Sequence, residues 1–372
     1  LAKDSLEPIS YRSGDKDRFD LVECEVGLYA FIEDGPLVSV LLPAYNSANW
    51  LPTAIDSLLN QTWKNIEILV IDDQSQDNTF EVAKAYEARD TRVRVLQNTI
   101  NAGPYVARNL ALENARGLFV TVHDADDWSH PRKIERQVQN LLENPELIAN
   151  TSQMVRLNPT NLQLLASGNQ ITRLNYSSLM FRRLEVTKTL GFWDPVRFGA
   201  DSEFMARLEI AFGADVLAHL ESGLLSLVRS VETSLTAGGL ADKLKGARKL
   251  YKRVFMEWHK ECEANPTELY LDAHGPRKFV APRKSLGLEQ PIESYPLVLV
   301  DDFSDASDSR LPKLLESRGL LANGCAYVQV PNPMSPAANE SRTIKDRAIN
   351  QELTNLRLIW DEYGVKLKLG SN

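Results

Sequence analysis

Between residues 37 and 144 the chain alternates between short apolar runs and longer amphipathic stretches. The run LVSVLLP at 37–43 is continuously apolar or β-branched, which is typical of a parallel strand covered on both faces. Residues 51–62 then place apolar side chains at helical spacing. Further strand and helix pairs follow at 66–72 and 79–88, at 92–98 and 104–115, and at 117–124 and 132–144. The alternation predicts an α/β fold with a Rossmann-like, mostly parallel sheet and helices on both faces.

The rest of the chain is less regular and suggests a division into parts. We expect an N-terminal extension or linker, a main α/β domain, a basic helix with a Pro-rich linker, and a partial second α/β unit of unknown role, at 1–36, 37–238, 239–295 and 296–372. The last part would be a C-terminal α/β extension, because a second series of strand-like and helix-like stretches begins at Pro296. Its LVLVDDFSDASD resembles ILVIDDQSQDNT at 68–79, which indicates similar chemistry at the two strand ends. The chain lacks an initial Met and opens in polar sequence, so we expect it to be part of a longer protein.

Charge and cysteine content argue against several classes of protein. The net charge of −8 does not suit a nucleic-acid-binding protein, because phosphate neutralisation needs clustered Lys and Arg. Cys24, Cys262 and Cys325 are odd in number and widely spaced, which favours neither a disulfide framework nor a zinc site. No apolar run approaches the roughly 20 residues of a membrane span. We therefore expect a soluble, cytoplasmic protein.

The basic stretch at 243–260 has two interpretations. Its Lys and Arg side chains could contact an anionic membrane or a lipid-linked acceptor, which would place the protein peripherally at the inner face of the plasma membrane. Alternatively, an apolar stripe packs on the core and the lysines remain in water. The sequence favours the second interpretation and leaves the first open.

Polar residues follow three of the predicted strands at the point where each strand ends. Ligands of open parallel sheets bind outside these carboxyl ends. Asp124 and Asp126 lie two positions apart, so in extended backbone both could reach one divalent cation, Mg²⁺ or Mn²⁺, with substrate phosphates completing its shell. They could instead only end the strand or cap the next helix. Tyr45 could stack on a nucleobase or be a surface aromatic, and Arg108 could bind phosphate, pair with the acidic cluster, or be solvated.

Four motifs in this order resemble the family 2 glycosyltransferases with the GT-A fold. They are VSVLLPAYNSANW, ILVIDDQSQDNT, the segment from NAGPYVARN to VHDADDW, and FWDPVRFGADSEFMARL, and together they cover about residues 37–236. The resemblance implies an enzyme that moves a sugar from a nucleotide-sugar donor, with a UDP-sugar favoured. The acceptor would be a hydroxyl of a glycan or a lipid-linked acceptor in surface polysaccharide assembly, and the reaction would invert the sugar carbon.

The resemblance also implies roles on the donor side. Tyr45 and Asp73 would hold the base, while Pro43 and Asn46 shape the same loop. Arg108 would lie beside the diphosphate. From the residues alone, Asp72 and Asp73 could each contact a base or ribose, and Asp72 could instead be a turn residue.

A metal and a general base are implied as well. Asp124 and Asp126 would bind the ribose and a divalent metal, with Asp126 as the direct metal ligand. Asp201 would take the proton of the acceptor hydroxyl, as an inverting displacement requires. Glu203 is the alternative base; on a helix the two carboxylates point to different faces, so only one should reach the acceptor. Asp201 could also merely cap that helix.

The chain departs from the family at Val231, where many relatives have a His, so a third protein ligand to the metal is in doubt. On the acceptor side, Arg173 and Tyr176 precede a predicted strand in the region that lines the cleft of relatives. Trp128 and Trp193 could stack on sugar rings, and Trp128 could instead anchor the loop after the acidic cluster.

Two alternative functions belong to other classes. A sugar-1-phosphate nucleotidyltransferase would open with a Gly-rich, basic phosphate loop, which LLPAYNSANW lacks. A non-catalytic carbohydrate-binding or scaffold module would not need Tyr45, Asp73, Asp126 and Asp201 together.

Overall fold

The computed structural model describes residues 6–15, 17–27, 31–165, 171–230, 238–279, 281–287, 298–301 and 326–329 of the 372-residue chain. The chain divides into two compact units, which we describe separately: residues 1–244 with 255–277, and residues 245–254 with 278–372. The boundaries expected from the sequence stay predictions.

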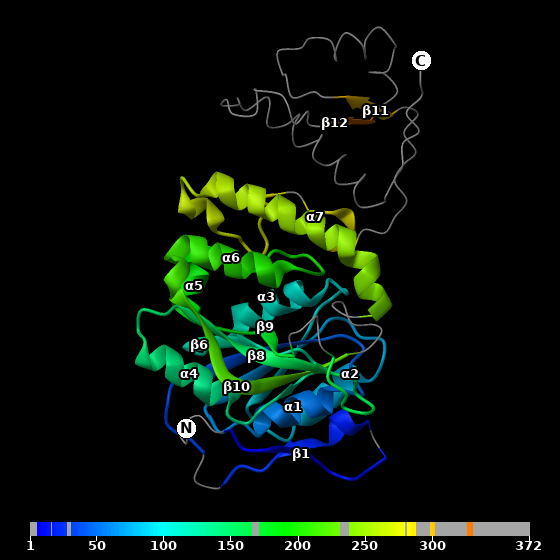
Figure 1. The fold of residues 1–372 in the computed structure, drawn as a ribbon, viewed down its shortest axis with the longest axis vertical. Helices are drawn as coiled ribbons and strands as arrows, with labels where there is room; N and C mark the ends of the chain where they lie inside the picture. Colours follow the sequence, from blue (N-terminus) through cyan, green and yellow to red (C-terminus); the bar gives the residue numbers. More distant parts are fainter. Residues whose placement is uncertain are drawn as a thin grey trace. The chain divides into compact units, whose positions relative to one another are not determined.

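The first unit is built on an eight-stranded sheet with the strand order β5-β4-β3-β6-β9-β8-β10-β7 (Figure 1). All of its strands except β7 and β9 run in the same direction, so the predicted α/β fold with a mostly parallel sheet is confirmed. The strands are β3 (Val38–Ala44), β4 (Ile66–Asp72), β5 (Val93–Gln97), β6 (Phe119–Val122), β7 (Trp128–Ser129), β8 (Ala149–Leu157), β9 (Arg173–Arg182) and β10 (Leu217–Arg229).

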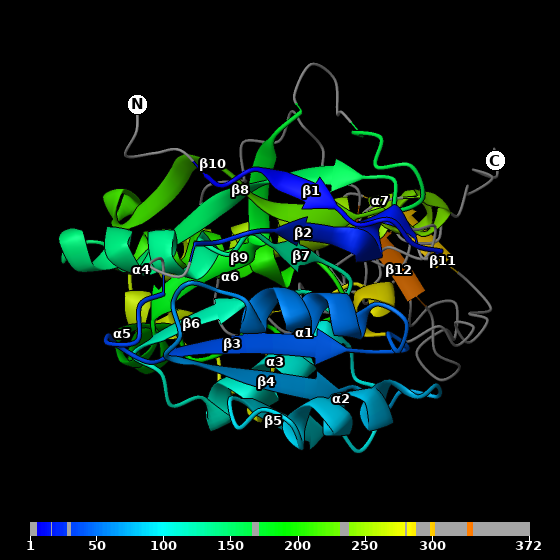
Figure 2. The same ribbon diagram turned by 90° about the horizontal axis from the view of Figure 1, so that it is seen from below.

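Helices cover both faces of this sheet. Alternate residues of β3 face opposite ways: Val40 and Leu42 join one core cluster with residues of α1 (Leu51–Leu59), α2 (Thr79–Glu87) and α4 (Lys133–Glu143). On the other face lie α3 (Pro104–Asn114), α5 (Arg183–Leu190) and α6 (Ala200–Phe212), as Figure 1 shows. Figure 2 views the sheet from the side of α1 and α2. Every strand and helix expected between residues 37 and 144 is present.

The register of the parallel strands sets the place of the site. Ala44 at the end of β3 is paired with Asp72 at the end of β4, and Leu41 of β3 is paired with Val122, the last residue of β6. The polar residues that follow these three strands therefore meet at one edge of the sheet, as the sequence predicts.

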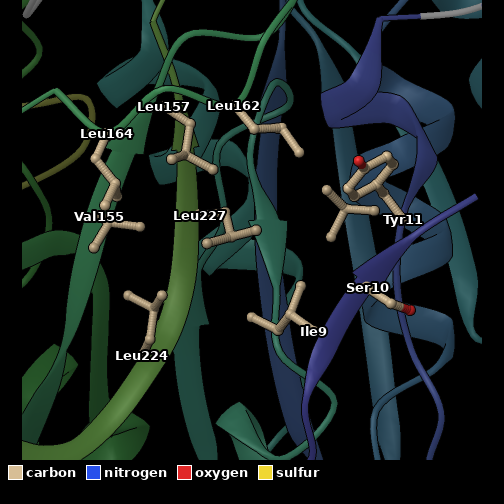
Figure 3. Close-up of a pocket in the computed structure, with 10 residues that line it drawn as sticks. Ile9, Ser10, Tyr11, Val155, Leu157, Leu162, Leu164, Leu224 and Leu227 are labelled. Carbon is tan, nitrogen blue, oxygen red and sulfur yellow. The ribbon is translucent and has the colours of Figure 1, made fainter.

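The N-terminal segment is folded onto the same unit, although the sequence predicts only an extension or linker there. It contains β1 (Ile9–Tyr11), the 3-10 helix η1 (Arg18–Leu21) and β2 (Val22–Cys24), and β1 pairs with β2. Phe19 is completely buried and packs in a cluster with Trp128, Val155 and Leu227. Figure 3 shows the apolar pocket beside this cluster, lined among others by Ile9, Leu157 and Leu224.

The long helix α7 (Gly238–Cys262) is amphipathic. Leu250, Val254 and Trp258 are buried, whereas Lys249 and Lys252 are exposed. This pattern favours the interpretation in which the apolar stripe packs inside the protein, and contact with a membrane stays a prediction. Among the described residues, no helix has both the length and the hydropathy needed to cross a bilayer.

The second unit shows β11 (Val298–Asp301) paired in parallel with β12 (Ala326–Gln329). These strands lie where the sequence predicts a C-terminal α/β extension. The rest of the predicted unit at 296–372 lies outside the described residues. Within the described ranges, the other short helices are η3 (Ala214–Val216), η4 (Pro266–Leu269) and η5 (Arg283–Leu286).

A buried ionic network fixes α6 within the first unit. Glu203 has no exposed surface. Its carboxylate accepts a hydrogen bond from Arg207 Nε at 2.8 Å and lies 3.0 Å from His259 Nε2. Arg207 also donates to the carbonyls of Leu190 at 2.6 Å and Leu269 at 3.0 Å. Burial opposes the ionisation of Glu203, but Arg207 and His259 outweigh it and hold the pKa of this carboxyl below its usual value. The network ties α6 to its neighbours as a rigid support.

We expect Glu203→Gln to lower the free energy of unfolding by about 3–5 kcal/mol, because it leaves the buried Arg207 without its charged partner. The measurement is urea denaturation at pH 7. The pKa of Glu203 is lowered on folding, so its contribution to stability is fully present above the usual pKa of 4.5 and is lost as the pH falls through the folded pKa. The difference between variant and wild type should therefore shrink in acid.

Glu209→Gln is the matched control, since Glu209 is exposed on the same helix. It should change the unfolding free energy by no more than about 0.5 kcal/mol. Equal losses in the two variants would contradict a supporting role for the buried network.

Candidate functional site

The centre of the site is the guanidinium of Arg108, which is 3% exposed on α3. Nη2 donates to Asp124 Oδ1 at 2.8 Å, and Nη1 forms a short ion pair with Asp201 Oδ1. Asp124 follows β6, and Asp201 lies in the first turn of α6. One cation thus joins two carboxylates that are 77 positions apart in the sequence. Pairing with the acidic cluster was one of the three roles predicted for Arg108.

Asp201 is held by two donors and keeps some access to solvent. Tyr105 donates its hydroxyl to Asp201 Oδ2 at 2.8 Å, and the Asp201 side chain is 20% exposed. Burial, and then the charge of Asp201, raise the pKa of Tyr105, so the phenol keeps its proton and remains a donor. Glu203 is fully buried in the network with Arg207. Of the two predicted bases, only Asp201 lies beside the other site residues.

The two carboxylates of the Asp-X-Asp element have different surroundings. Asp124 accepts from Arg108 and from Ser177 Oγ at 2.6 Å; burial opposes its ionisation, but these partners hold its pKa below the usual value. Burial, and then the charge of Asp124, raise the pKa of Asp126 to about 6. Asp126 is therefore the less compensated of these two carboxylates, and a bound cation would favour its ionised form.

Three further titratable residues of this region, Asp127, Lys133 and His123, are buried. Burial, and then the neighbouring carboxylates Asp126 and Asp124, raise the pKa of Asp127 well above its usual value. Lys133 is also buried, and desolvation lowers its pKa to about 8 despite the nearby Asp127 and Asp124. His123, directly before the cluster, is buried, and desolvation lowers its pKa to about 3. It is therefore a neutral residue directly after β6.

The acidic loop offers oxygen donors for a divalent metal. Asp124 and Asp126 supply the oxygen ligands that Mn²⁺ or Mg²⁺ prefers. In the described ranges no group of three or more His, Cys, Asp or Glu side chains converges on one point. Val231, where relatives have a His, lies outside the described residues. The donor set therefore fits an ion that takes most of its ligands from substrate and water.

The edge predicted to hold the base combines an exposed aromatic ring with a loop fixed by a hydrogen bond. Tyr45 is 44% exposed, so its ring is accessible. Asn46 has a positive φ of 48° and accepts from the backbone of Gln76 at 2.8 Å, which fixes the loop after β3. Pro43 is buried within β3.

Asp73 has a structural role that the sequence does not predict. Its carboxylate accepts from Asn98 Nδ2 at 2.6 Å, from the Ala102 amide at 3.0 Å and from the Gly103 amide at 2.7 Å, and it is 3% exposed. It therefore anchors the turn into α3. Asp72 Oδ1, by contrast, is buried without a hydrogen-bond partner among the described residues.

The acceptor-side candidates separate into two groups. Both polar candidates lie on β9: Tyr176, directly before Ser177, is 43% exposed, and Arg173, the first residue of the strand, is half-buried. Trp193 is 1% exposed and stacks on Phe204 at 4.5 Å, and Trp128 is 5% exposed. The faces of both tryptophans are covered by protein, so we assign them to packing and not to sugar binding. Trp128 packs with Phe19 and Leu227 and so anchors the loop after the acidic cluster, which is the second of the two roles considered for it.

The sequence analysis missed two residues of the site. Tyr105 lies three positions before Arg108 on the same helix face, a spacing from which its role could have been inferred. Arg229 ends the apolar strand β10 and donates through Nε to the Asp126 carbonyl at 3.2 Å. The only signal for Arg229 is a charged residue inside the apolar run LLSLVRS.

Comparison with known proteins places these residues in a family. The family model described as Glycosyl transferase family 2 matches residues 39–199. The putative teichuronic acid biosynthesis glycosyltransferase TuaG of Bacillus subtilis is 38% identical over 108 residues, which are 29% of this chain and 43% of that protein. UDP-Glc:alpha-D-GlcNAc-diphosphoundecaprenol beta-1,3-glucosyltransferase WfgD of Escherichia coli is 40% identical over 111 residues, 30% of this chain and 43% of its own. The chain thus spans less than half the length of these curated relatives.

Solved structures show distant similarity. S. aureus TarS 1-349 in complex with UDP-GlcNAc has a TM-score of 0.45 and 21% identity, over 53% of this chain and 59% of TarS. Mannosyltransferase PcManGT from Pyrobaculum calidifontis, in complex with GDP-Man and Mn²⁺, has a TM-score of 0.47 and 15% identity, over 89% and 88%. The family match itself covers β3 to α5, including Asp73, Arg108, Asp124 and Asp126. Residues 39–199 are therefore similar to the family 2 glycosyltransferases.

Proposed function

We propose that this domain transfers a hexosyl group from a UDP-sugar to a hydroxyl of a glycan or lipid-linked acceptor, with inversion at the sugar carbon. The observation that carries the proposal is the contact of Arg108 with both Asp124 and Asp201. Asp124, which is suited to the donor side, and Asp201, which is suited to the acceptor side, thus bind the same guanidinium. A reaction that joins a donor to an acceptor needs groups for both substrates close together.

The donor would bind at the carboxyl ends of β3, β4 and β6. Tyr45 is exposed enough to stack on a base. Asp73 lies at the same edge, and we keep it as the proposed base contact beside the three hydrogen bonds that it accepts from Asn98 and from the turn into α3. The name of the relative WfgD, a UDP-Glc-dependent enzyme, supports UDP as the nucleotide and a lipid diphosphate as the acceptor anchor.

Asp126 would be the principal protein ligand of a divalent ion, Mn²⁺ or Mg²⁺. Its raised pKa marks an uncompensated carboxylate, whereas both oxygens of Asp124 already accept hydrogen bonds. When bound, the ion would neutralise the charge that grows on the departing diphosphate. Asp124 would then serve mainly to contact the ribose and to orient Arg108.

Asp201 would act as the general base. The bond between the sugar carbon and the diphosphate oxygen breaks while the acceptor oxygen bonds to the opposite face of that carbon. Asp201 takes the hydroxyl proton, so the acceptor oxygen attacks with its electron pair. Tyr105 and Arg108 each bond one oxygen of Asp201, which fixes the carboxylate toward the acceptor.

A thermal-shift panel of UDP, GDP and dTDP, each with and without Mn²⁺, tests the donor class. UDP with Mn²⁺ at about 100 times Kd should raise Tm by about 5–10 °C, because a ligand that binds only the folded state stabilises it. The other nucleotides should have smaller effects. If none of the nucleotides raises Tm, with or without Mn²⁺, the proposal of a nucleotide-sugar donor is wrong.

Asp126→Asn should remove the Mn²⁺-dependent part of this Tm shift, since the amide is a much weaker ligand than the carboxylate. Glu209→Gln, which changes an exposed carboxylate far along α6, is the control and should keep the full shift. If Asp126→Asn keeps the metal-dependent shift, the metal is bound elsewhere.

Asp201→Asn should lower the rate of transfer by about 10²–10⁴-fold, the usual contribution of a general base, while the Tm shift with UDP and Mn²⁺ remains. The rate is measured as UDP released in the presence of acceptor glycans or polyprenyl-diphosphate sugars. Asp215→Asn is the matched control, because Asp215 is exposed in η3. Full activity of Asp201→Asn would exclude Asp201 as the base, and loss of nucleotide binding would indicate a donor-side role.

A further inference from the structure

Arg229 links the N-terminal segment to the acidic loop that follows β6. Its side chain is completely buried. Nε donates to the carbonyl of Asp126 at 3.2 Å, and the backbone amide of Arg229 donates to Asp127 Oδ1 at 3.2 Å. Two contacts thus hold consecutive residues of the loop. The position of the Asp126 carboxylate depends on where Arg229 is held.

Asp20 holds Arg229 from the other side. Nη2 of Arg229 forms a short ion pair with Asp20 Oδ1, and Nη1 lies 3.3 Å from Asp20 Oδ2. Thr53 of α1 donates to Asp20 Oδ1 at 2.7 Å, so the carboxylate is itself fixed. Phe19 places its ring 4.2 Å below the guanidinium, which adds a cation–π contact.

We propose that Asp20 is a positioning residue for the donor site, acting through Arg229 on the loop Asp126–Asp127. The inference rests on the proposed function, because it concerns the loop assigned to the nucleotide diphosphate and the metal. Both Asp20 and Arg229 lie outside residues 39–199, the range of the family match. The N-terminal segment would therefore be part of the working site of this chain.

The physical argument is one of charge compensation. A buried guanidinium needs a carboxylate partner. Asp17 Oδ2 is the next carboxylate, at 4.0 Å, but its side chain is 44% exposed, which makes it a weaker substitute. Without Asp20, Arg229 would turn toward the carboxylates of the acidic loop. It would then neutralise the charge that Asp126 offers to a cation.

The test compares Asp20→Asn with Glu23→Gln in the full chain. Glu23 lies in the same N-terminal segment and forms an exposed pair with Arg12, so its variant controls for charge loss there. Calorimetric titration with UDP in the presence of Mn²⁺ should give about 10-fold weaker binding for Asp20→Asn, as is usual when the partner of a ligand-bearing group is lost. Hydrogen exchange should also become faster in the peptide spanning 123–130. Glu23→Gln should resemble the wild type in both measurements.

The two measurements separate this inference from the proposed function. Unchanged exchange at 123–130 in Asp20→Asn overturns the role of Asp20, whether or not the wild type binds UDP. Wild-type affinity for UDP and Mn²⁺ in a folded Asp20→Asn overturns it as well. A wild type that binds no nucleotide overturns the proposed function, whereas faster exchange in the variant would still support the control of the loop by Asp20.

A second variant covers the case in which Asp20→Asn does not fold. The double change Asp20→Leu with Arg229→Met removes both charges together, which buried pairs often tolerate. It also removes the hydrogen bond to the Asp126 carbonyl. The folded double variant should bind UDP with Mn²⁺ about 10-fold more weakly than the wild type. Wild-type binding by this variant would overturn the inference.

Discussion

The arrangement of the site depends on one buried cation, Arg108. It lies on the helix that packs against β3 and β4, and it pairs with a carboxylate at the end of β6 and with another at the start of α6. Either carboxylate alone at the edge of a sheet would be an ordinary acidic residue. Because a buried guanidinium must be compensated, the pairing forces the central sheet and α6 into a fixed relation. The acceptor-side carboxylate is thereby set against the donor-side loop.

Much of the fold could be predicted from the sequence because the strands of a covered parallel sheet are continuously apolar. The runs that became β3 and β4 show this pattern, and polar residues mark their carboxyl ends. The N-terminal segment could not be predicted in the same way. Its strands β1 and β2 are only three residues long, and Phe19 in the 3-10 helix between them contacts Arg229, a residue far away in the sequence. Local patterns carry no information on such contacts.

The candidate residues show the same division. Helical geometry separates Asp201 from Glu203, but only packing shows that Glu203 belongs to a closed ionic network and Asp201 to the site. An aromatic residue near a sugar-binding motif suggests stacking, yet Trp193 is covered on its face by Phe204. Asp73 has the residue type for base recognition and serves also to cap the turn into α3. Residue type indicates what a side chain could do, while its neighbours determine whether it is accessible.

The contact between Asp20 and Arg229 has a consequence for synthesis on the ribosome. The two residues are separated by 209 positions. At the roughly 5–20 residues per second of translation, about 10–40 s pass between the emergence of one partner and that of the other. The acidic loop leaves the ribosome about halfway through that interval, and from then until residue 229 emerges it lacks the arginine that places it. A nascent chain can therefore contain every matched family motif and still lack an assembled site. The acidic loop is positioned only after β10, which ends in Arg229, has been made.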